Sequence, residues 1–189
     1  SLFSRKIRKM AYRITKTSLP GVLIVNATIY KDDRGYFYER FNKKEFSSSI
    51  NQDVDFVQDN CSYSKKGVLR GLHFQNPRPQ GKLIRVASGS IFDVAVDIRK
   101  NSDSFGKWFG IELSSENHTQ LWIPEGFAHG FQVISDEALV IYKTTDYWHP
   151  ESEQSIAWDD PTLNINWPLK DSVIINQKDA SAKNLNKIN

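Results

Sequence analysis

The chain has 189 residues, enough for one well-formed core without a second domain. Its 39% of hydrophobic residues, with 12% aromatics, exclude a disordered protein. Of the 25 Lys and Arg, four lie in residues 1–9, and the other 21 are matched by 22 acidic residues, which excludes the clustered basic surface of a nucleic-acid-binding protein.

The N-terminus has no apolar run of signal-peptide length. Met10 is the only methionine, so we expect translation to start there naturally and residues 1–9 to be an artificial or disordered leader. No stretch approaches the roughly 18–20 apolar residues of a membrane-spanning helix. The single cysteine, Cys61, cannot form an internal disulfide, and we expect it to be a half-buried strand residue of a cytoplasmic protein.

Apolar and polar residues alternate with a period of two through most of the chain, which predicts strands. One helix is expected at residues 43–49, with Asn42 as its N-cap and Glu45 at the capping-box position. Strands are expected at residues 22–30, 36–41, 54–58, 68–75, 83–87, 91–98, 108–113, 120–123, 127–134 and 138–147. This spacing predicts an all-β protein, a single jelly-roll sandwich or barrel over residues 10–180, followed by a polar, frayed tail at 181–189.

The expected strand at 91–98 places its large apolar residues on one face and Asp93 and Asp97 on the other, with Arg99 following on the same side. Acids on the surface of a strand usually pair with a neighbouring Lys or Arg. We therefore leave Asp93 and Asp97 out of the candidate site.

Residues 70–75, with the sequence RGLHFQ, place Arg70 and His73 in an otherwise apolar strand. Histidine is a natural general base near neutral pH, although a strand histidine is more often structural. In a regular strand Arg70 and His73 point to opposite faces, so a shared site requires an irregularity, and Gly71 is the expected position of a bulge. A regular ladder with His73 outside the barrel would contradict a site here.

Residues 124–130, with the sequence PEGFAHG, deliver His129 onto a strand through a Pro-x-Gly-x-x-His turn. This turn is similar to the second metal motif of cupin barrels. The stretch corresponding to the first motif holds only His73 where cupins have a His-x-His pair, and zinc or iron usually needs three protein ligands. We therefore expect a cupin without a metal.

Five segments together resemble the dTDP-4-dehydrorhamnose 3,5-epimerase family, in the family's order and over about residues 13–179. They are RGLHFQ, QGKLIRVASGSIFDVAVDIRKNSDSFGKW, LSSENHTQLWIPEGFAHGF, YKTTDYWHPESE and WDDPTLNINWP. The resemblance implies a cupin-type jelly roll that inverts C3 and C5 of dTDP-4-dehydro-6-deoxy-D-glucose without a cofactor. It also implies a homodimer in which the N-terminal strand region adds to the partner's sheet.

By the same resemblance, His73 is the base, Asp179 orients it, Lys82 stabilises the enolate oxygen and Tyr142 protonates from the opposite face. The positions that match the family's contacts to the nucleotide sugar are Arg34, Glu39, Gln58, Asp59, Asn60, Arg70, His129, Glu153 and Lys178. Arginines suit the two phosphates because they bind oxyanions through two hydrogen bonds. Each residue alone has a structural interpretation, and their joint occurrence favours a site.

Three alternatives stay open. An enzyme that inverts only C3, or that moves the ketone, could use the same base with a shifted acid. A non-catalytic sugar-binding cupin would keep the arginines and lack the base or the acid. A metal-dependent oxygenase would bind stoichiometric iron through His73 and His129.

Overall fold

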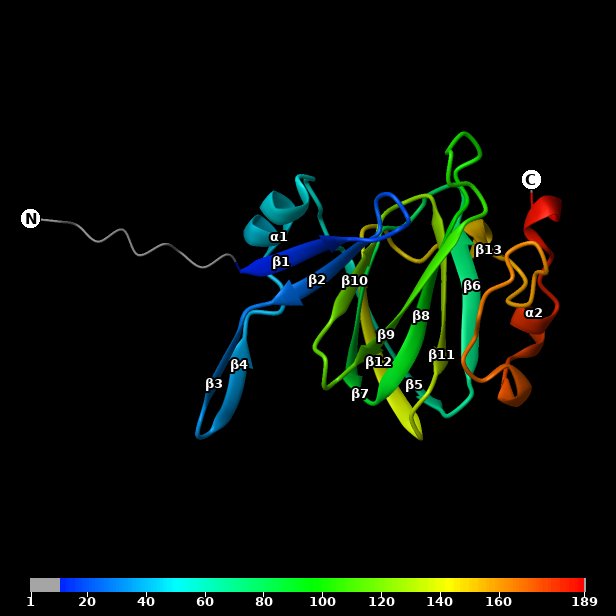
Figure 1. Ribbon diagram of the computed structural model, residues 1–189. Coiled ribbons are helices and arrows are strands. Elements are labelled where there is room, and N and C mark those ends of the chain that lie inside the picture. The colour runs from blue at the N-terminus through cyan, green and yellow to red at the C-terminus, as the bar shows by residue number, and fades with distance from the viewer. Residues whose placement is uncertain (1–10, 189) are drawn as a thin grey trace, which may run out of the picture.

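Two antiparallel sheets face one another in the computed structural model, which describes residues 11–188 (Figure 1). The six-stranded sheet has the order β1 (Tyr12–Lys16), β2 (Leu23–Ala27), β10 (Gln120–Ile123), β7 (Lys82–Ser88), β12 (Glu137–Thr144) and β5 (Gln58–Lys65). The five-stranded sheet has the order β13 (Glu153–Ser155), β6 (Leu69–Gln75), β11 (Phe127–Val133), β8 (Ser90–Asp97) and β9 (Trp108–Ser114). The predicted all-β, cupin-type jelly roll is confirmed.

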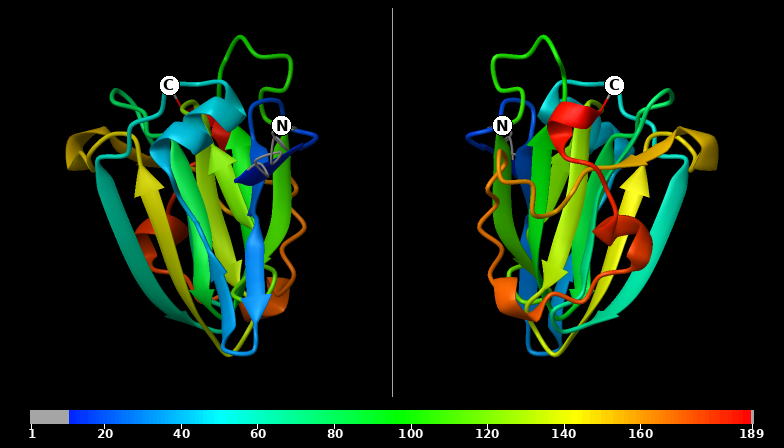
Figure 2. Two further views of the ribbon diagram at one scale, coloured as in Figure 1. Left: turned by 90° about the vertical axis from the view of Figure 1, so that its left-hand side faces the viewer. Right: turned by 90° about the vertical axis from the view of Figure 1, so that its right-hand side faces the viewer.

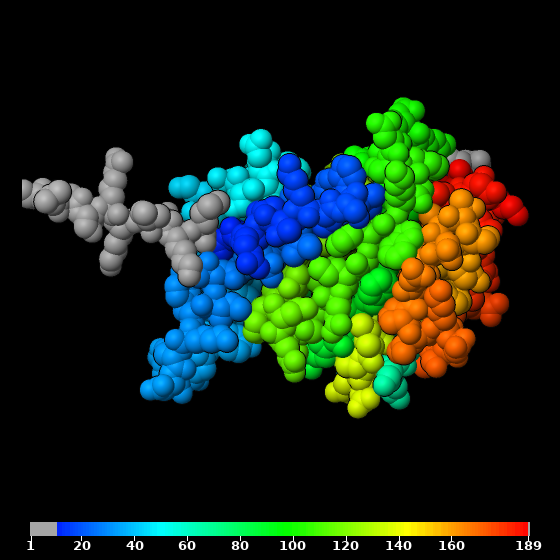
Figure 3. All heavy atoms as spheres, in the orientation of Figure 1, coloured from blue at the N-terminus to red at the C-terminus, as the bar shows by residue number. Residues whose placement is uncertain are grey.

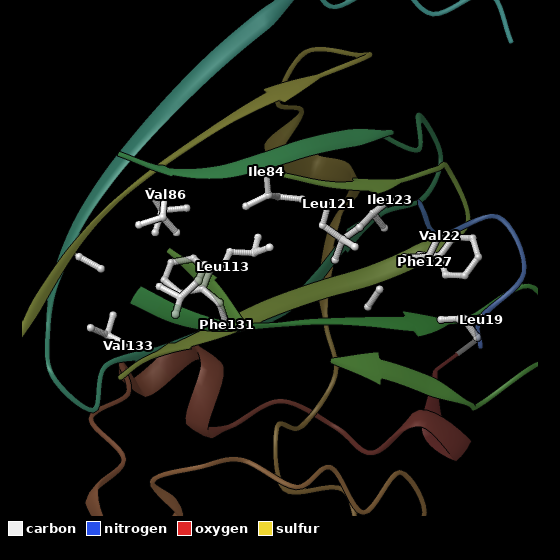
Figure 4. Close-up of a cluster of buried hydrophobic side chains, with 14 residues drawn as sticks. Leu19, Val22, Ile84, Val86, Leu113, Leu121, Ile123, Phe127, Phe131 and Val133 are labelled. Atoms are coloured by element: carbon white, nitrogen blue, oxygen red, sulfur yellow. The ribbon is translucent and has the colours of Figure 1, made fainter. Parts of the chain in front are cut away.

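The space between the sheets is filled by aliphatic and aromatic side chains from both of them (Figure 4). Ile84 on β7 and Val140 on β12 meet Ala95 on β8 and Phe131 on β11, and all four are at most 3% exposed. Because successive residues of a strand point to opposite faces, the period of two in the sequence places alternate residues on the inner and the outer face of each sheet.

The outer face of the six-stranded sheet is covered near β1 and β10 by helix α1 (Lys43–Ile50). The helix begins as predicted, with Asn42 Oδ1 accepting a hydrogen bond from the backbone N–H of Glu45 at 3.1 Å. Its buried residue Phe46 packs edge-on against Trp122. The strand predicted at residues 54–58 is wrong: Val54 packs into this cluster outside any strand, and β5 begins only at Gln58.

A two-stranded hairpin, β3 (Ile29–Asp32) and β4 (Gly35–Tyr38), pairs with neither large sheet. It projects from the body beyond β2 (Figures 1 and 3). Phe37 is 71% exposed and Tyr36 is 57% exposed, so the hairpin presents aromatic side chains to its surroundings. Such a surface is typical of a contact with another molecule.

The C-terminal segment covers the outer face of the five-stranded sheet (Figure 2, right). Its short elements are η1 (Pro150–Ser152), η2 (Lys170–Ser172), α2 (Gln177–Ala180) and η3 (Leu185–Lys187). The prediction of a frayed tail is wrong for residues 181–188, because Leu185 is buried and its backbone N–H donates to Asp160 Oδ2 at 2.7 Å. The predicted leader, residues 1–9, lies outside the described residues.

Two further expectations concern single features. Cys61 is exposed because it alternates with the less exposed Asn60 and Ser62 on β5, and the prediction of a half-buried residue is wrong. Within residues 11–188, no helix has the length and apolar character needed to cross a membrane.

Candidate active site

A pocket of about 460 Å³ opens between the two sheets. Strands β6 and β11 of the five-stranded sheet and β5, β7 and β12 of the six-stranded sheet supply its walls. It is lined by eight of the residues predicted from the sequence, namely Gln58, Asn60, Arg70, His73, Lys82, His129, Tyr142 and Glu153. The candidate site is therefore assembled from segments almost 100 residues apart in the chain.

An irregularity at Gly71 turns both Arg70 and His73 toward this pocket. On β11, His129 pairs with His73 and Phe131 pairs with Arg70, so β6 advances three residues where β11 advances two. Gly71 has φ = +114°, and a Cβ atom there would lie 2.6 Å from the His129 carbonyl oxygen. Only glycine fits this conformation and this approach, and the predicted bulge is confirmed.

His73 forms a hydrogen-bonded pair with Asp179. Its Nε2 lies 2.7 Å from Asp179 Oδ1, and the other carboxylate oxygen accepts the backbone N–H of Gly71 at 3.1 Å. Asp179 is held in α2, where Asn176 Oδ1 accepts its backbone N–H at 2.8 Å. Burial raises the pKa of Asp179, but His73, the backbone N–H of Gly71 and the charge of Lys178 together outweigh it, and the pKa lies below its ordinary value. Asp179 is thus an ionised partner that orients the imidazole.

Lys82 and Tyr142 line the pocket from the opposite, six-stranded sheet. Burial lowers the pKa of Lys82 to about 8, against the opposing effects of Asp93 and Glu153. Its ammonium makes no hydrogen bond or ion pair with another residue of the described chain, and it lies 6.0 Å from the centre of the Tyr142 ring. Burial raises the pKa of Tyr142, and Asn60 opposes that rise. Lys82 can therefore meet a negative oxygen, while Tyr142 retains its proton at neutral pH.

His129 forms a second pair, with Asp93, which the sequence analysis left out. The His129 Nε2 lies 2.7 Å from Asp93 Oδ1, and Asp93 is fully buried. The predicted alternation in β8 is correct, but the face we took as solvent-facing is the interior of the barrel. Asp97 is also buried, and it pairs with Arg99 at 2.8 Å as expected of an acid beside a basic neighbour.

Four further predicted residues do not line the pocket, and they lie in three different places. Lys178 is not a lining residue, but its Nζ pairs with Oε2 of the lining residue Glu153 at 2.8 Å. Asp59 points to the outer face of β5 because it alternates with Gln58 and Asn60. Its Oδ1 lies 3.7 Å from Lys143 Nζ. Arg34 and Glu39 belong to the exposed hairpin region and do not line the pocket of their own chain. The structure therefore does not bring Asp59, Arg34 or Glu39 into this pocket.

Seven of the fifteen lining residues were not predicted from the sequence, and Trp148 and Gln75 are two of them. Trp148 stands at the mouth of the pocket, 56% exposed, with its backbone N–H bonded to Gln58 Oε1 at 2.9 Å. Gln75 is buried at the end of β6, and its Oε1 accepts the backbone N–H of His149 at 2.8 Å. An aromatic residue in the polar stretch YWHPESE was a usable signal for Trp148, whereas nothing in the sequence distinguishes Gln75.

Within residues 11–188, no three His, Cys, Asp or Glu side chains converge in an arrangement that would hold a metal ion. The two pocket histidines, His73 and His129, each use one ring nitrogen for a carboxylate. The chemistry that these residues offer is proton transfer beside a cation, with polar groups around it for a ligand.

Comparisons with known proteins agree with this chemistry. A model of the dTDP-4-dehydrorhamnose 3,5-epimerase family matches residues 16–187. A dTDP-4-dehydrorhamnose 3,5-epimerase from Methanothermobacter thermautotrophicus is 54% identical over 92% of this chain and 95% of that protein. The crystal structure of a 3,5-epimerase from Legionella pneumophila with dTDP-4-keto-L-rhamnose has a TM-score of 0.92 and 52% identity, and the match covers 94% of this chain and 95% of that one. A double mutant of a 3′-monoepimerase from Streptomyces bikiniensis, in complex with dTDP, has a TM-score of 0.85 at 28% identity, over 90% of this chain and 86% of that one.

Proposed function

The chain belongs to the dTDP-4-dehydrorhamnose 3,5-epimerase family, and from that premise we propose that its pocket inverts C3 and C5 of dTDP-4-dehydro-6-deoxy-D-glucose, giving dTDP-4-dehydro-L-rhamnose. The reaction removes a proton from each carbon beside the C4 ketone and returns a proton to the other face of the ring. It needs a base, an acid on the opposite side and a group that stabilises negative charge on O4.

One observation carries the proposal: His73 and Tyr142 stand on opposite walls of the same pocket. His73 comes from β6 in one sheet, and Tyr142 comes from β12 in the other. A sugar ring between them meets the base on one face and the acid on the other. A base alone could exchange the protons with solvent but would have no donor on the far face to complete an inversion.

Lys82 supports the same reaction from β7, which lies beside the β12 strand of Tyr142. When His73 takes a proton from C3 or C5, the electron pair moves toward the C4 carbonyl and O4 becomes negative. The Lys82 ammonium has its N–H groups free for that oxygen, and burial strengthens its electrostatic effect. The proton lost from carbon passes to His73, whose Nε2 already faces Asp179 and whose Nδ1 is left as the base.

The polar groups around the pocket bind the nucleotide sugar. Arg70 is anchored by its Nε to Ser64 Oγ at 2.9 Å, which leaves part of its guanidinium for a phosphate. Gln58, Asn60 and Glu153 line the same space, and Lys178 is paired with Glu153. Metal and cofactor have no step in this reaction as proposed.

We further propose a cytoplasmic homodimer in which the hairpin of one chain completes the partner's pocket. Arg34 lies at the exposed end of the hairpin, its side chain 90% exposed, and Glu39 follows β4. Two aromatic residues of the same hairpin, Tyr36 and Phe37, are also exposed and would be buried in such a contact. A two-fold axis would insert both hairpins equivalently, since a symmetric interface repeats each contact.

The test is to incubate the protein with dTDP-4-dehydro-6-deoxy-D-glucose in deuterated water and to follow label at C3 and C5 by mass spectrometry and NMR. We expect deuterium at both carbons and the L-rhamno product. Label at C3 alone would select the C3-only epimerase, and no label at either carbon would overturn the proposal. His73→Ala should bind dTDP and lose the exchange.

A further inference from the structure

The strongest unassigned feature beside the pocket is the buried carboxylate of Asp93, the partner of the lining residue His129. It lies on β8, is 0% exposed and accepts a hydrogen bond from His129 through Oδ1. Its other oxygen, Oδ2, has no hydrogen-bond partner among residues 11–188. A buried carboxylate oxygen without a partner is costly, so its retention points to a role in the site.

The first consequence of Asp93 concerns His129. Burial lowers the pKa of His129, although Asp93 opposes this effect, so the imidazole is neutral near pH 7. A neutral imidazole carries one N–H, and a carboxylate can only accept, so the proton sits on Nε2 toward Asp93. The other nitrogen, Nδ1, is then an acceptor, and His129 lines the pocket. The pair therefore presents a hydrogen-bond acceptor to a sugar hydroxyl.

The second consequence concerns Lys82, which is buried in the same pocket. Lys82 on β7 and Asp93 on β8 share a strand face with the core residues Ile84 and Ala95, so both side chains point into the space between the sheets. Asp93 and Glu153 on β13 both favour the charged form of Lys82. His129 on β11 is neutral, and Tyr142 on β12, whose ring centre lies 6.0 Å from Lys82 Nζ, keeps its proton. Neither therefore supplies a negative charge to Lys82. Glu153 is already paired with Lys178. Asp93 is thus the carboxylate available to balance the buried ammonium.

We propose that Asp93 is a positioning residue that holds His129 in its Nε2–H tautomer and supplies the fixed negative charge that keeps Lys82 protonated. The inference deepens the proposed function and rests on it for the use of Lys82. Asp93 acts through these two residues and does not itself touch the substrate.

The test compares the pH dependence of kcat/KM for the wild type and for Asp93→Asn. Removing the charge favours neutral Lys82, so the basic limb of the profile should move to lower pH. We expect a loss of about 10–100-fold at pH 8 and a smaller loss at pH 6. Asp93→Glu keeps the charge and should return the limb toward its wild-type position.

Asp97→Asn is the matched control. Asp97 is an equally buried acid on the same strand, but its partners are Arg99, Ser102 and Ser104, outside the pocket. If a general loss of structure were responsible, both variants would lose activity at all pH values and neither would shift the basic limb. An unshifted limb in Asp93→Asn would overturn the proposal.

A second readout does not need turnover. The rate at which the Lys82 amine is acetylated, followed by mass spectrometry across pH, reports its protonation in the wild type and in each folded variant. The midpoint should fall in Asp93→Asn and remain in Asp97→Asn, and an unchanged midpoint would refute the role of Asp93. If Asp93→Asn does not fold, Asp93→Ser, a smaller neutral replacement, decides by the same measurement: its midpoint should fall, and an unchanged midpoint would refute the role of Asp93. A shifted midpoint in a protein that exchanges no substrate proton would leave this inference standing and overturn the proposed function.

Discussion

The Nε2 of His73 lies 2.7 Å from Oδ1 of Asp179, which stands 106 residues further along the chain. The same carboxylate accepts the backbone N–H of Gly71 at 3.1 Å. One side chain from the C-terminal segment therefore fixes both the ring of the proposed base and the bulge that turns that base inward. This double contact explains why the C-terminal segment, although it lies outside the two sheets, belongs to the candidate site.

Replacing Asp179 with asparagine should impair proton transfer more than binding. The amide can occupy the same position, but it lacks the charge that stabilises protonated His73 and it can select the wrong tautomer. By analogy with other histidine–carboxylate pairs, kcat should fall by roughly 10²–10⁴-fold. Affinity for dTDP, measured by titration calorimetry, should stay within about threefold of wild type. Asp171→Asn, an exposed acid on η2, should change neither quantity; a kcat equal to wild type in Asp179→Asn would remove Asp179 from the mechanism.

Replacing Gly71 with alanine should be among the most costly single changes in the barrel. The new Cβ would lie 2.6 Å from the His129 carbonyl oxygen and 2.7 Å from the Gly130 Cα. Both are backbone atoms, so the clash cannot be relieved by rotating a side chain. With the positive φ added, we expect a loss of about 3 kcal/mol or more in the free energy of unfolding. Urea denaturation of purified protein measures it.

Gly106→Ala is the control for this substitution. Gly106 also has a positive φ of +76°, but its Cβ would meet only Leu185 Cδ2, at 3.5 Å. The free energy of unfolding of Gly106→Ala should fall by about 1 kcal/mol, which is the cost of the positive φ alone. Equal losses in the two variants would mean that the close approach of β6 and β11 contributes nothing.

The fold was predictable because most of its strands are short runs of β-branched and aromatic residues and its turns carry strong signals. The residues that escaped this logic are those whose state depends on distant packing. Residues 54–58 have a strand-like composition, but Val54 is drawn into the cluster under α1. Leu185 lies in a polar sequence, and only its contact with Asp160 reveals that it is anchored.

The candidate site was predictable only in part, for related reasons. Family resemblance located His73, Lys82 and Tyr142, which line one pocket. Asp93 escaped because alternation separates the two faces of a strand without saying which one meets the interior of a barrel. Arg34 could not be placed either, because sequence does not distinguish a residue that serves its own pocket from one that serves a partner's.

Trp148 should contribute to nucleotide affinity. It stands exposed at the mouth of the pocket, where a flat base could stack on its ring, and such stacking is worth about 1–3 kcal/mol. Trp148→Ala should therefore weaken dTDP binding by roughly tenfold in calorimetry while leaving kcat at saturation nearly unchanged. Tyr147→Ala removes an adjacent aromatic of the same 56% exposure that does not line the pocket, and it should bind dTDP like wild type. Equal affinity in both variants would exclude stacking on Trp148.

The hairpin can be tested by mixing defective chains. Arg34→Ala should lose affinity for substrate although Arg34 does not line the pocket of its own chain. His73→Ala should lose the proposed base. If Arg34 serves the partner, a mixed dimer holds one intact pocket, formed by His73 of the Arg34→Ala chain and Arg34 of the His73→Ala chain. Random pairing of equal amounts should therefore restore activity to about one quarter of wild type at low substrate concentration.

The control is a mixture of His73→Ala with Tyr142→Phe. Both residues line the same pocket of a single chain, so each pocket of a mixed dimer still carries one lesion and activity should not recover. Differently tagged chains, co-expressed and purified through both tags, allow the mixed dimers to be assayed alone. Recovery only in the Arg34 mixture assigns the hairpin to the partner's pocket. If Arg34 served the pocket of its own chain, both pockets of a mixed dimer would still carry one substitution. Lack of recovery in both mixtures would confine each pocket to its own chain.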